Sequence, residues 1–181
     1  GEPRLYSRAV PGGYVQFEGD RLLDMLMLKF DGLVRRDYLG TDGGAFFDRG
    51  SLFVEFARGV ADGGYRRAYE LLSEEVLRRS SIVYIQVTFD ESNRRNEARY
   101  QAALAHSILA HRLPDEALQR FSAQQDFLEL VDGRDEGFLE LRGVQVPFVV
   151  IHNAPELHER GALDARYAPR FQKLWELQQR R

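Results

Sequence analysis

Two apolar runs constrain the fold of this chain more than any other feature. Residues 82–88 read Ile-Val-Tyr-Ile-Gln-Val-Thr, and residues 144–151 read Val-Gln-Val-Pro-Phe-Val-Val-Ile. Such runs are typical of strands that are covered on both faces, as in a parallel sheet. Helical periodicity separates them, and strands joined through helices imply right-handed crossovers. The sequence therefore predicts an α/β domain of three layers, with a mostly parallel sheet flanked by helices.

A further strand is predicted over residues 45–48, where Ala-Phe-Phe leads into Asp48-Arg49 after a glycine-containing loop. Helices are predicted where apolar residues recur at helical spacing. Their ranges are 20–31, 51–58, 65–79, 90–109 and 164–179. Helix 20–31 is apolar almost all round, so we expect it to be deeply buried. In helix 164–179 we expect the aromatic residues, among them Phe171 and Trp175, to face inward.

The similar tetrapeptides at 127–130 and 138–141, Phe-Leu-Glu-Leu, flank Asp132-Gly133 and predict a β-hairpin or a compact excursion. At 181 residues the chain is expected to form a single domain over 1–181. The net charge of −3 disfavours a general nucleic-acid or membrane-surface binder. Because there is no cysteine, disulfides and thiolate chemistry are excluded. No segment resembles a signal peptide and no apolar run reaches about 18 residues, so we expect a cytoplasmic protein.

Charged residues follow the predicted strands. In open α/β sheets, ligands bind at the carboxyl ends of the strands, and there the chain places Asp48-Arg49 and Asn153. Arg95 and Arg99 lie one turn apart on the helix after strand 82–88. A carboxylate facing several arginines suits phosphoryl transfer, which needs a proton acceptor or metal ligand together with cations for the phosphate.

Structural roles remain open for the same residues. Asp48 and Arg49 can form an ordinary ion pair at a strand end. Arg95 and Arg99 can belong to a solvated helix face paired with neighbouring glutamates. The four histidines have no i,i+4 pair and no His-Glu-x-x-His pattern, so their spacing does not predict a zinc site.

The order of these motifs resembles the P-loop nucleoside and nucleotide kinases. An apolar strand that ends in Asp48-Arg49-Gly-Ser51 is similar to the Asp/Glu-Arg-Ser element of deoxynucleoside kinases and the Asp-Arg element of thymidylate kinases. The stretch from Asp90-Glu91 to Arg95 and Arg99 resembles the lid of those enzymes. The resemblance covers roughly residues 45–180 and rests on pattern and element order.

The resemblance implies an ATP-dependent phosphotransferase that uses Mg²⁺. Asp48 would be the base or the magnesium ligand, and Arg49 would lie near the phosphates. Arg95 and Arg99 would close over the transferred phosphate within a lid-like region, residues 92–126. Asn153 would lie near the nucleotide base. The acceptor stays open among nucleosides, nucleotides and other small hydroxyl compounds.

One hallmark of that family is not in this chain: Gly-x4-Gly-Lys-Ser/Thr, the loop that holds the nucleotide phosphates. We expect this loop either upstream of Gly1 or lost in evolution. The second case predicts a non-catalytic, kinase-like binding or assembly module. The expected partners are a small-molecule substrate and a nucleotide, without nucleic acid or membrane, and the apolar helix 20–31 is compatible with a homodimer.

Overall fold

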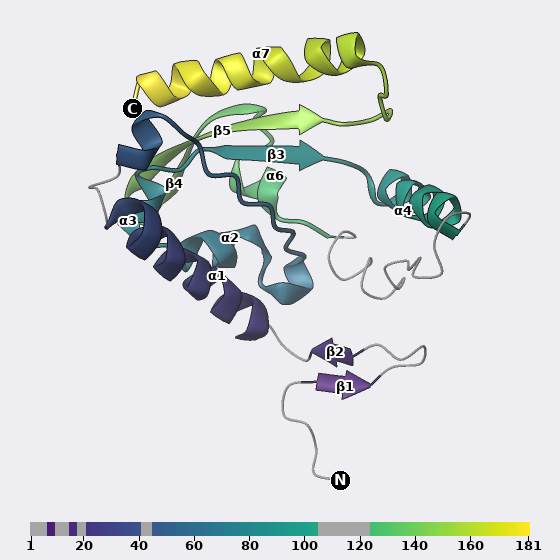
Figure 1. Cartoon of the computed structure of the whole chain (residues 1–181), viewed down its shortest axis with the longest axis horizontal. Helices are drawn as coiled ribbons and strands as arrows, with labels where there is room; N and C mark the ends of the chain where they lie inside the picture. Colours follow the sequence, from purple (N-terminus) through teal and green to yellow (C-terminus); the bar gives the residue numbers. More distant parts are fainter. Residues whose placement is uncertain (1–6, 10–14, 18–20, 41–44, 105–123) are drawn as a thin grey trace.

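The computed structural model describes residues 7–9, 15–17, 21–40, 45–104 and 124–181 (Figure 1). The strands are β1 (Ser7–Ala9), β2 (Val15–Phe17), β3 (Ile82–Gln86), β4 (Glu136–Leu141) and β5 (Val144–His152). The helices are α1 (Arg21–Val34), α2 (Gly64–Glu70), α3 (Glu74–Leu77), α4 (Phe89–Leu104), α6 (Phe127–Leu130) and α7 (Arg160–Gln179). Short helical segments are the π-helix η1 (Arg35–Leu39) and the 3-10 helices η2 (Ala45–Asp48) and η3 (Val60–Asp62).

The central sheet has the strand order β3-β5-β4, and β1 and β2 form a separate antiparallel ribbon. Strands β3 and β5 run parallel, with Ile82 opposite Phe148 and Gln86 opposite His152. This confirms the strands predicted over 82–88 and 144–151. The predicted three-layer, mostly parallel, kinase-like sheet is wrong, because the described sheet is small and mixed and most of the surrounding elements are helical. Strand β4 pairs antiparallel with β5.

The tight turn between β4 and β5 accounts for the antiparallel edge. Leu141 pairs with Val144, which leaves Arg142 and Gly143 as a two-residue loop. Both loop residues have positive φ, 51° and 78°, as the favoured two-residue hairpin turns require. Arg142 Nη1 donates to the main-chain oxygens of Glu70 and Leu72, at 3.2 and 3.4 Å. Of the two alternatives predicted for 127–141, the β-hairpin is wrong, because residues 127–130 form helix α6 and only 138–141 lie in a strand, β4.

Residues 45–58 form neither of the elements predicted for them. Residues 45–48 form the 3-10 helix η2 instead of a strand, and residues 51–59 are extended without regular structure instead of helical. Phe46 packs edge-on against Tyr38 of η1, with ring centroids 5.0 Å apart. The aromatic side chains of 45–48 thus pack against η1, and none of the described strands pairs with this segment.

The core lies under the sheet, on the side of α2 and α6 (Figure 1). Tyr84 of β3 stacks on Phe127 of α6 with centroids 4.2 Å apart, and Tyr65 and Tyr69 of α2 contact the same ring edge-on. Aromatic pairs of this geometry stabilise a core beyond their buried area. Helix α7 covers the opposite face over β5, where Val149 and Ile151 are buried.

Two helices expose more apolar surface than their patterns predict. In α1 the side chains of Met25, Leu26 and Leu28 are exposed, so the expectation of a deeply buried helix is wrong. In α7 Leu174 and Leu177 are buried, but Phe171 and Trp175 are exposed rather than inward-facing. Both helices pack through one stripe only, since each has a single layer of the protein beside it.

Candidate functional site

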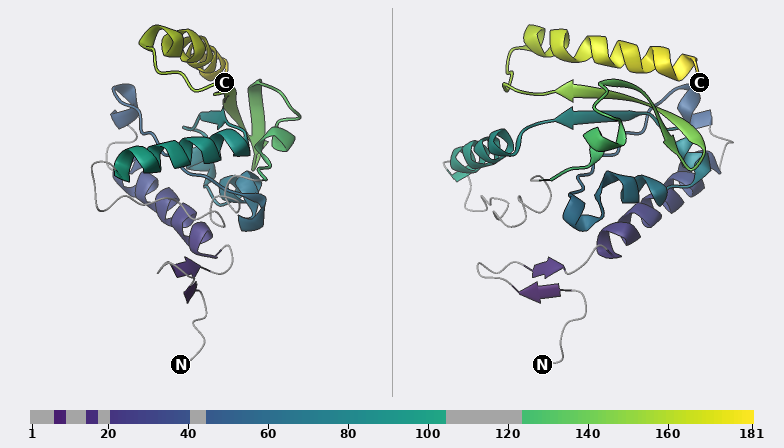
Figure 2. Two further views of the ribbon diagram at one scale, coloured as in Figure 1. Left: turned by 90° about the vertical axis from the view of Figure 1, so that its right-hand side faces the viewer. Right: turned by 180° about the vertical axis from the view of Figure 1, so that it is seen from behind.

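The most densely connected polar group at a sheet edge lies where β3 and β5 end. Helix α4 projects beyond the end of β3 (Figures 1 and 2), and Thr88 Oγ1 accepts from the main-chain N–H of Glu91, at 3.3 Å, in its first turn. The main-chain N–H of Asn153 donates to Gln86 O at 2.9 Å, which continues the β3–β5 pairing by one residue. The ends of two parallel strands, α4 and the loop after β5 therefore meet at one edge.

We call the charged group at this edge the strand-end cluster. It consists of Glu91, Arg94, Arg95, Asn153, Glu156 and Arg166. Glu91 accepts hydrogen bonds from Arg94, at 2.7 and 2.8 Å, and from Arg95 Nε, at 2.8 Å. Arg94 and Arg95 also lie 3.4 and 3.7 Å from the carboxylate of Glu156. Two glutamates thus hold the side chains of two consecutive arginines.

Asn153 joins the cluster to helix α7. Its main-chain oxygen accepts from Arg95 Nη2, and its side-chain Oδ1 accepts from Arg166 Nη1 at 3.1 Å. Arg166 also donates to the main-chain oxygen of Pro155 at 2.7 Å, next to the cis Ala154–Pro155 peptide bond. Asn153 was predicted from its place after a strand, whereas Arg166 was not, because it lies inside helix α7 rather than directly after β5.

The ion pairs determine the charge states of the cluster. The hydrogen bonds of Arg94 and Arg95 hold the pKa of Glu91 at about 2, against 4.5 for an unperturbed glutamate. The hydrogen bond to Glu91 in turn raises the pKa of Arg94 above its ordinary value. Glu91 is therefore ionised at neutral pH and serves as an ion-pair partner. It is a poor proton acceptor for catalysis, since its basicity is so low.

The low pKa of Glu91 predicts how acid acts on the fold. A carboxylate whose pKa is depressed by folding contributes stability above its unfolded value, and this contribution is lost as the pH falls toward the folded value. For Glu91 that window runs from about pH 4.5 down to about pH 2. We expect the unfolding free energy of the wild type to fall more steeply across this window than that of Glu91→Gln in urea titrations. The control is Glu74→Gln, which removes the charge of an exposed carboxylate that pairs with Arg78. If the unfolding free energies of Glu91→Gln and the wild type fell in parallel between pH 4.5 and about pH 2, the expectation would be refuted.

The two predicted lid arginines differ in their surroundings. Arg95 has only 11% of its side chain exposed and ties α4 to the loop after β5, so it acts as a positioning residue. Arg99, one turn further along α4, is exposed, and no carboxylate among the described residues pairs with it. Arg94 is also largely exposed. Of the lid-like region 92–126, residues 105–123 lie outside the described residues.

Asp48 and Arg49 do not join the strand-end cluster. Both are exposed and lie at or just after η2, and Phe47 of η2 packs against Val34, Leu39 and Val76. Val76 belongs to α3, which precedes the first residue of β3, whereas Arg95 follows the last one. The predicted base or magnesium ligand therefore lies at the opposite end of β3 from Arg95 and Arg99. This placement corrects the expectation that strand ends would bring them together.

A buried charge cluster beneath α1 was not predicted from the sequence. Asp24 Oδ1 accepts from Arg58 Nη2 at 2.7 Å, and Asp24 Oδ2 accepts from Arg67 Nη2 at 2.8 Å. Burial raises the pKa of Asp24, but the hydrogen bonds of Arg67 and Arg58 outweigh this effect and leave its pKa below the ordinary value. Arg58 is only 1% exposed. No motif joins residues this far apart in the chain, so only the packing reveals them.

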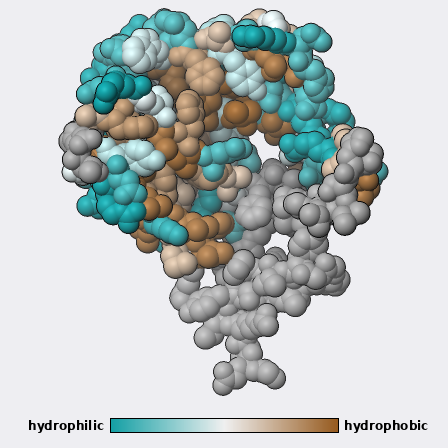
Figure 3. All heavy atoms as spheres, viewed as in Figure 1, coloured by the Kyte–Doolittle hydropathy of each residue, from teal (hydrophilic) through white to brown (hydrophobic). Residues whose placement is uncertain are grey.

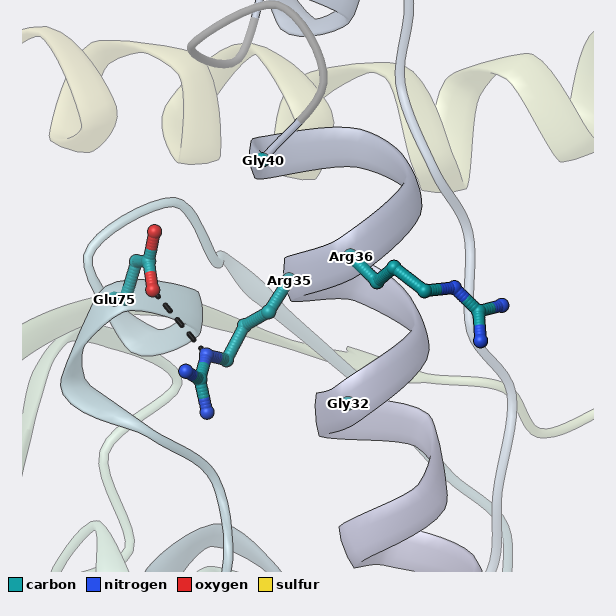
Figure 4. Close-up of a pocket in the computed structure, with 5 residues that line it drawn as sticks. All are labelled: Gly32, Arg35, Arg36, Gly40 and Glu75. Atoms are coloured by element: carbon teal, nitrogen blue, oxygen red, sulfur yellow. Dashed lines mark hydrogen bonds and ion pairs between the residues drawn. The ribbon is translucent and has the colours of Figure 1, made fainter.

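A surface hollow of about 410 Å³ lies beside α1 (Figure 4). It is lined by Gly32, Arg35, Arg36, Gly40 and Glu75. Arg35 points toward Glu75 and its Nε lies 3.3 Å from that carboxylate, while Arg36 points away and pairs with Asp37. Its arginines pair with carboxylates, as Arg94 and Arg95 do, but the hollow lies away from the carboxyl ends of β3 and β5, where ligands of open sheets bind.

Within the described part of the chain, no group of three or more histidine, aspartate or glutamate residues could hold a metal ion. None of the described helices has the length and apolarity to cross a membrane. Comparison with known proteins gives no further assignment: no family model, no curated protein and no solved structure matches this chain.

Proposed function

We propose that the strand-end cluster, with Arg99, binds the phosphates of ATP and that the protein is a phosphotransferase acting on a small acceptor. One observation carries this proposal: Arg94, Arg95 and Arg166 meet at the carboxyl ends of two parallel strands, and Arg99 lies one turn further along α4. Ligands of open parallel sheets bind at this edge. Phosphoryl transfer depends mainly on positioning and on cations that stabilise the transferring phosphate. With ATP as the donor, the proposal retains the expectation of a cytoplasmic protein.

The residues of the cluster take different roles in this proposal. Arg94 and Arg99 have exposed guanidinium groups and would contact the phosphates directly. Glu91 and Asn153 hold Arg95, and Asn153 also holds Arg166. Glu156 is a partly exposed carboxylate beside both arginines, and Mg²⁺ is commonly held by one or two carboxylates together with substrate phosphates. Mg²⁺ would then be bound by Glu156 and would neutralise phosphate charge. Asp48 has no part in this site.

Titration calorimetry with Mg-ATP tests the proposal. We expect binding by the wild type, and we expect Arg99→Ala to weaken it by about tenfold, because a hydrogen bond to a charged group contributes about 1.5–3 kcal/mol. Arg94→Ala should have a similar effect. The matched control is Arg79→Ala, an exposed arginine near the beginning of β3. Consumption of ATP should then be measured with hydroxyl and phosphate acceptors.

Two outcomes would contradict the proposal. One is that millimolar Mg-ATP gives no binding heat in calorimetry and does not protect the chain from proteolysis. The other is equal affinity in the wild type and the double variant Arg94→Ala/Arg99→Ala, which would move any nucleotide site away from the strand ends.

A second candidate is a non-catalytic binding or assembly module. Its specific support is the apolar surface of the folded chain: Phe53, Trp175 and Ile85 have 83%, 62% and 49% of their surface exposed. Large exposed apolar patches mark interaction sites in soluble proteins. This candidate predicts no Mg-ATP binding together with self-association or partner binding.

A further inference from the structure

A histidine–aspartate pair lies at the end of β5, beside the strand-end cluster. His152 is the last residue of β5, and its Nε2 lies 2.9 Å from Asp135 Oδ1. Asp135 reaches this place because β4 runs antiparallel to β5. The main-chain N–H of Val150 donates to Asp135 O at 2.7 Å, which extends the pairing of the two strands beyond the first residue of β4. The pair therefore lies at the carboxyl end of β5, the same sheet edge as the cluster.

The contact with Asp135 decides which ring nitrogen of His152 is free. A carboxylate can only accept hydrogen bonds, so Nε2 of the neutral imidazole carries the proton that Asp135 accepts. Nδ1 then keeps its lone pair and can take a proton from another molecule. The side chain of His152 is 54% exposed, so a small molecule can reach the ring. His152 thus has the features of a general base whose ring is oriented by a carboxylate.

Helix α7 holds the second oxygen of Asp135 and links the pair to the strand-end cluster. Arg170 Nη2 lies 3.3 Å from Asp135 Oδ2, so the carboxylate is held at both oxygens. Arg166, one turn before Arg170 on the same helix, donates to Asn153 Oδ1 in the cluster. Asn153 directly follows His152. The imidazole therefore belongs to the residue next to the one that the arginines of the cluster bind.

The other charged groups near the pair have partners of their own. Glu136, the first residue of β4, lies 2.8 Å from Lys173 Nζ and 3.6 Å from Arg170 Nη1, and these contacts fasten α7 over β4. Among the described charged side chains, only Asp135 pairs with His152. On the face drawn in Figure 3, hydrophilic side chains lie at the upper right, where the loop after β5 approaches α4. The edge that carries the pair is thus polar and open to water.

We infer that His152 is the general base of the phosphotransferase and that the acceptor is a hydroxyl compound. This inference rests on the proposed function, in which neither Asp48 nor Glu91 can serve as the base. A phosphate acceptor needs no base, because its oxygens are already ionised at neutral pH, the second pKa of a phosphate group being about 6. A hydroxyl group keeps its proton at neutral pH. A base beside the phosphate-binding arginines therefore indicates a hydroxyl acceptor.

Proton transfer to His152 accompanies the attack on ATP. Nδ1 takes the proton of the acceptor hydroxyl while the hydroxyl oxygen forms a bond to the γ-phosphorus. The bond from the γ-phosphorus to the bridging oxygen breaks, and its electron pair leaves on ADP. Asp135 stabilises the imidazolium ion and is a positioning residue, since it acts through His152. The exposed ring then releases its proton to water.

Hydrolysis of Mg-ATP tests the base before any acceptor is identified, because water is itself a hydroxyl compound. Calorimetry first measures Mg-ATP binding, which we expect to be equal in the wild type and His152→Gln. Hydrolysis should be at least about 100-fold slower in His152→Gln, the usual contribution of a general base. The rate of the wild type should fall between about pH 7 and pH 5, where histidine takes up a proton, and the rate of His152→Gln should not. The control is His158→Gln, at an exposed histidine that pairs with none of the described carboxylates.

Two neighbouring carboxylates separate catalysis from a purely structural role of the pair. Asp135→Asn should lower kcat by at least about tenfold at unchanged affinity for Mg-ATP, because the ring loses the carboxylate that orients it. Glu136→Gln removes a carboxylate that contacts α7 but not His152, and it should leave kcat unchanged. A pair that only fastens β4 to β5 would lower the unfolding free energy in Asp135→Asn without changing kcat, and this result would overturn the inference.

The remaining outcomes distinguish this inference from the proposed function. If the wild type binds no Mg-ATP, the proposed function fails and the assignment of the base fails with it. If Mg-ATP binds but neither water, nucleosides nor sugars accept its phosphoryl group, the inference alone is overturned. Transfer to nucleoside monophosphates only, or equal hydrolysis by the wild type and His152→Gln, would overturn it as well.

Discussion

Replacement of Asp24 by alanine is expected to lower the unfolding free energy by about 3–5 kcal/mol, the cost of breaking a buried ion pair by removing one partner. Asp24 is the carboxylate that Arg58 pairs with, at 2.7 Å. Arg58 is 1% exposed, and its Nε and Nη1 have no hydrogen-bond partner among the described residues. Without Asp24 the fully buried guanidinium would lose the carboxylate to which it is hydrogen-bonded. Chemical denaturation at neutral pH, where Asp24 is ionised, measures the loss.

Two further variants separate the charge effect from simple truncation. Asp37→Ala removes an exposed carboxylate that pairs with Arg36, and such surface pairs contribute about 0–1 kcal/mol. The double variant Asp24→Leu/Arg58→Met should recover most of the loss seen in Asp24→Leu, because apolar replacement of a whole buried pair is often neutral or stabilising. A loss in Asp24→Ala no larger than that in Asp37→Ala would contradict the prediction.

Gly64→Ala is expected to destabilise the fold by about 2–4 kcal/mol, through backbone strain and the loss of a helix cap. Gly64 has φ +70°, which L-residues adopt at a cost, and an added Cβ would lie 2.6 Å from Asp126 Cγ. The carboxylate of Asp126 accepts from the main-chain N–H groups of Tyr65, at 2.6 Å, and Arg66, at 3.1 Å, in the first turn of α2. A side chain at position 64 would displace this cap.

Gly133→Ala is the matched control for this substitution. Gly133 has φ +68°, almost the same conformation, but a Cβ there would have no atom within 4 Å. Gly133→Ala should therefore lower the unfolding free energy only by the cost of the strained backbone, about 1–2 kcal/mol. Equal losses of unfolding free energy in the two variants, measured by urea denaturation, would show that Asp126 does not matter to α2.

Strands β3 and β5 follow from the sequence alone, because runs rich in β-branched and aromatic residues favour strands. The expected cover on both faces holds for most of β5, whereas Ile85 of β3 is 49% exposed. The parallel pairing was predicted from the helical segments between them, since strands joined through helices pair in parallel by crossover connections. The expectation that Arg95 and Asn153 lie near each other rests on the same reasoning, and the structure joins them by a hydrogen bond. The local sequence pattern thus determines the edge at which β3 and β5 end, and it places Arg95 and Asn153 there.

Tertiary structure decided the conformation of residues 45–48, the exposure of the apolar side chains of α1 and α7, and the buried ion pair. Residues 45–48 have an apolar run like that of a strand, but the aromatic side chains pack on η1, and Asp48 is therefore far from the arginines. The exposure of Leu26 and Trp175 depends on what lies beside each helix, which periodicity does not encode. Asp24 and Arg58 are 34 residues apart and pair because folding brings their segments together, where Arg67 also donates to Asp24. Local propensity acts over a few residues, whereas burial and charge pairing depend on segments that meet only in the folded chain.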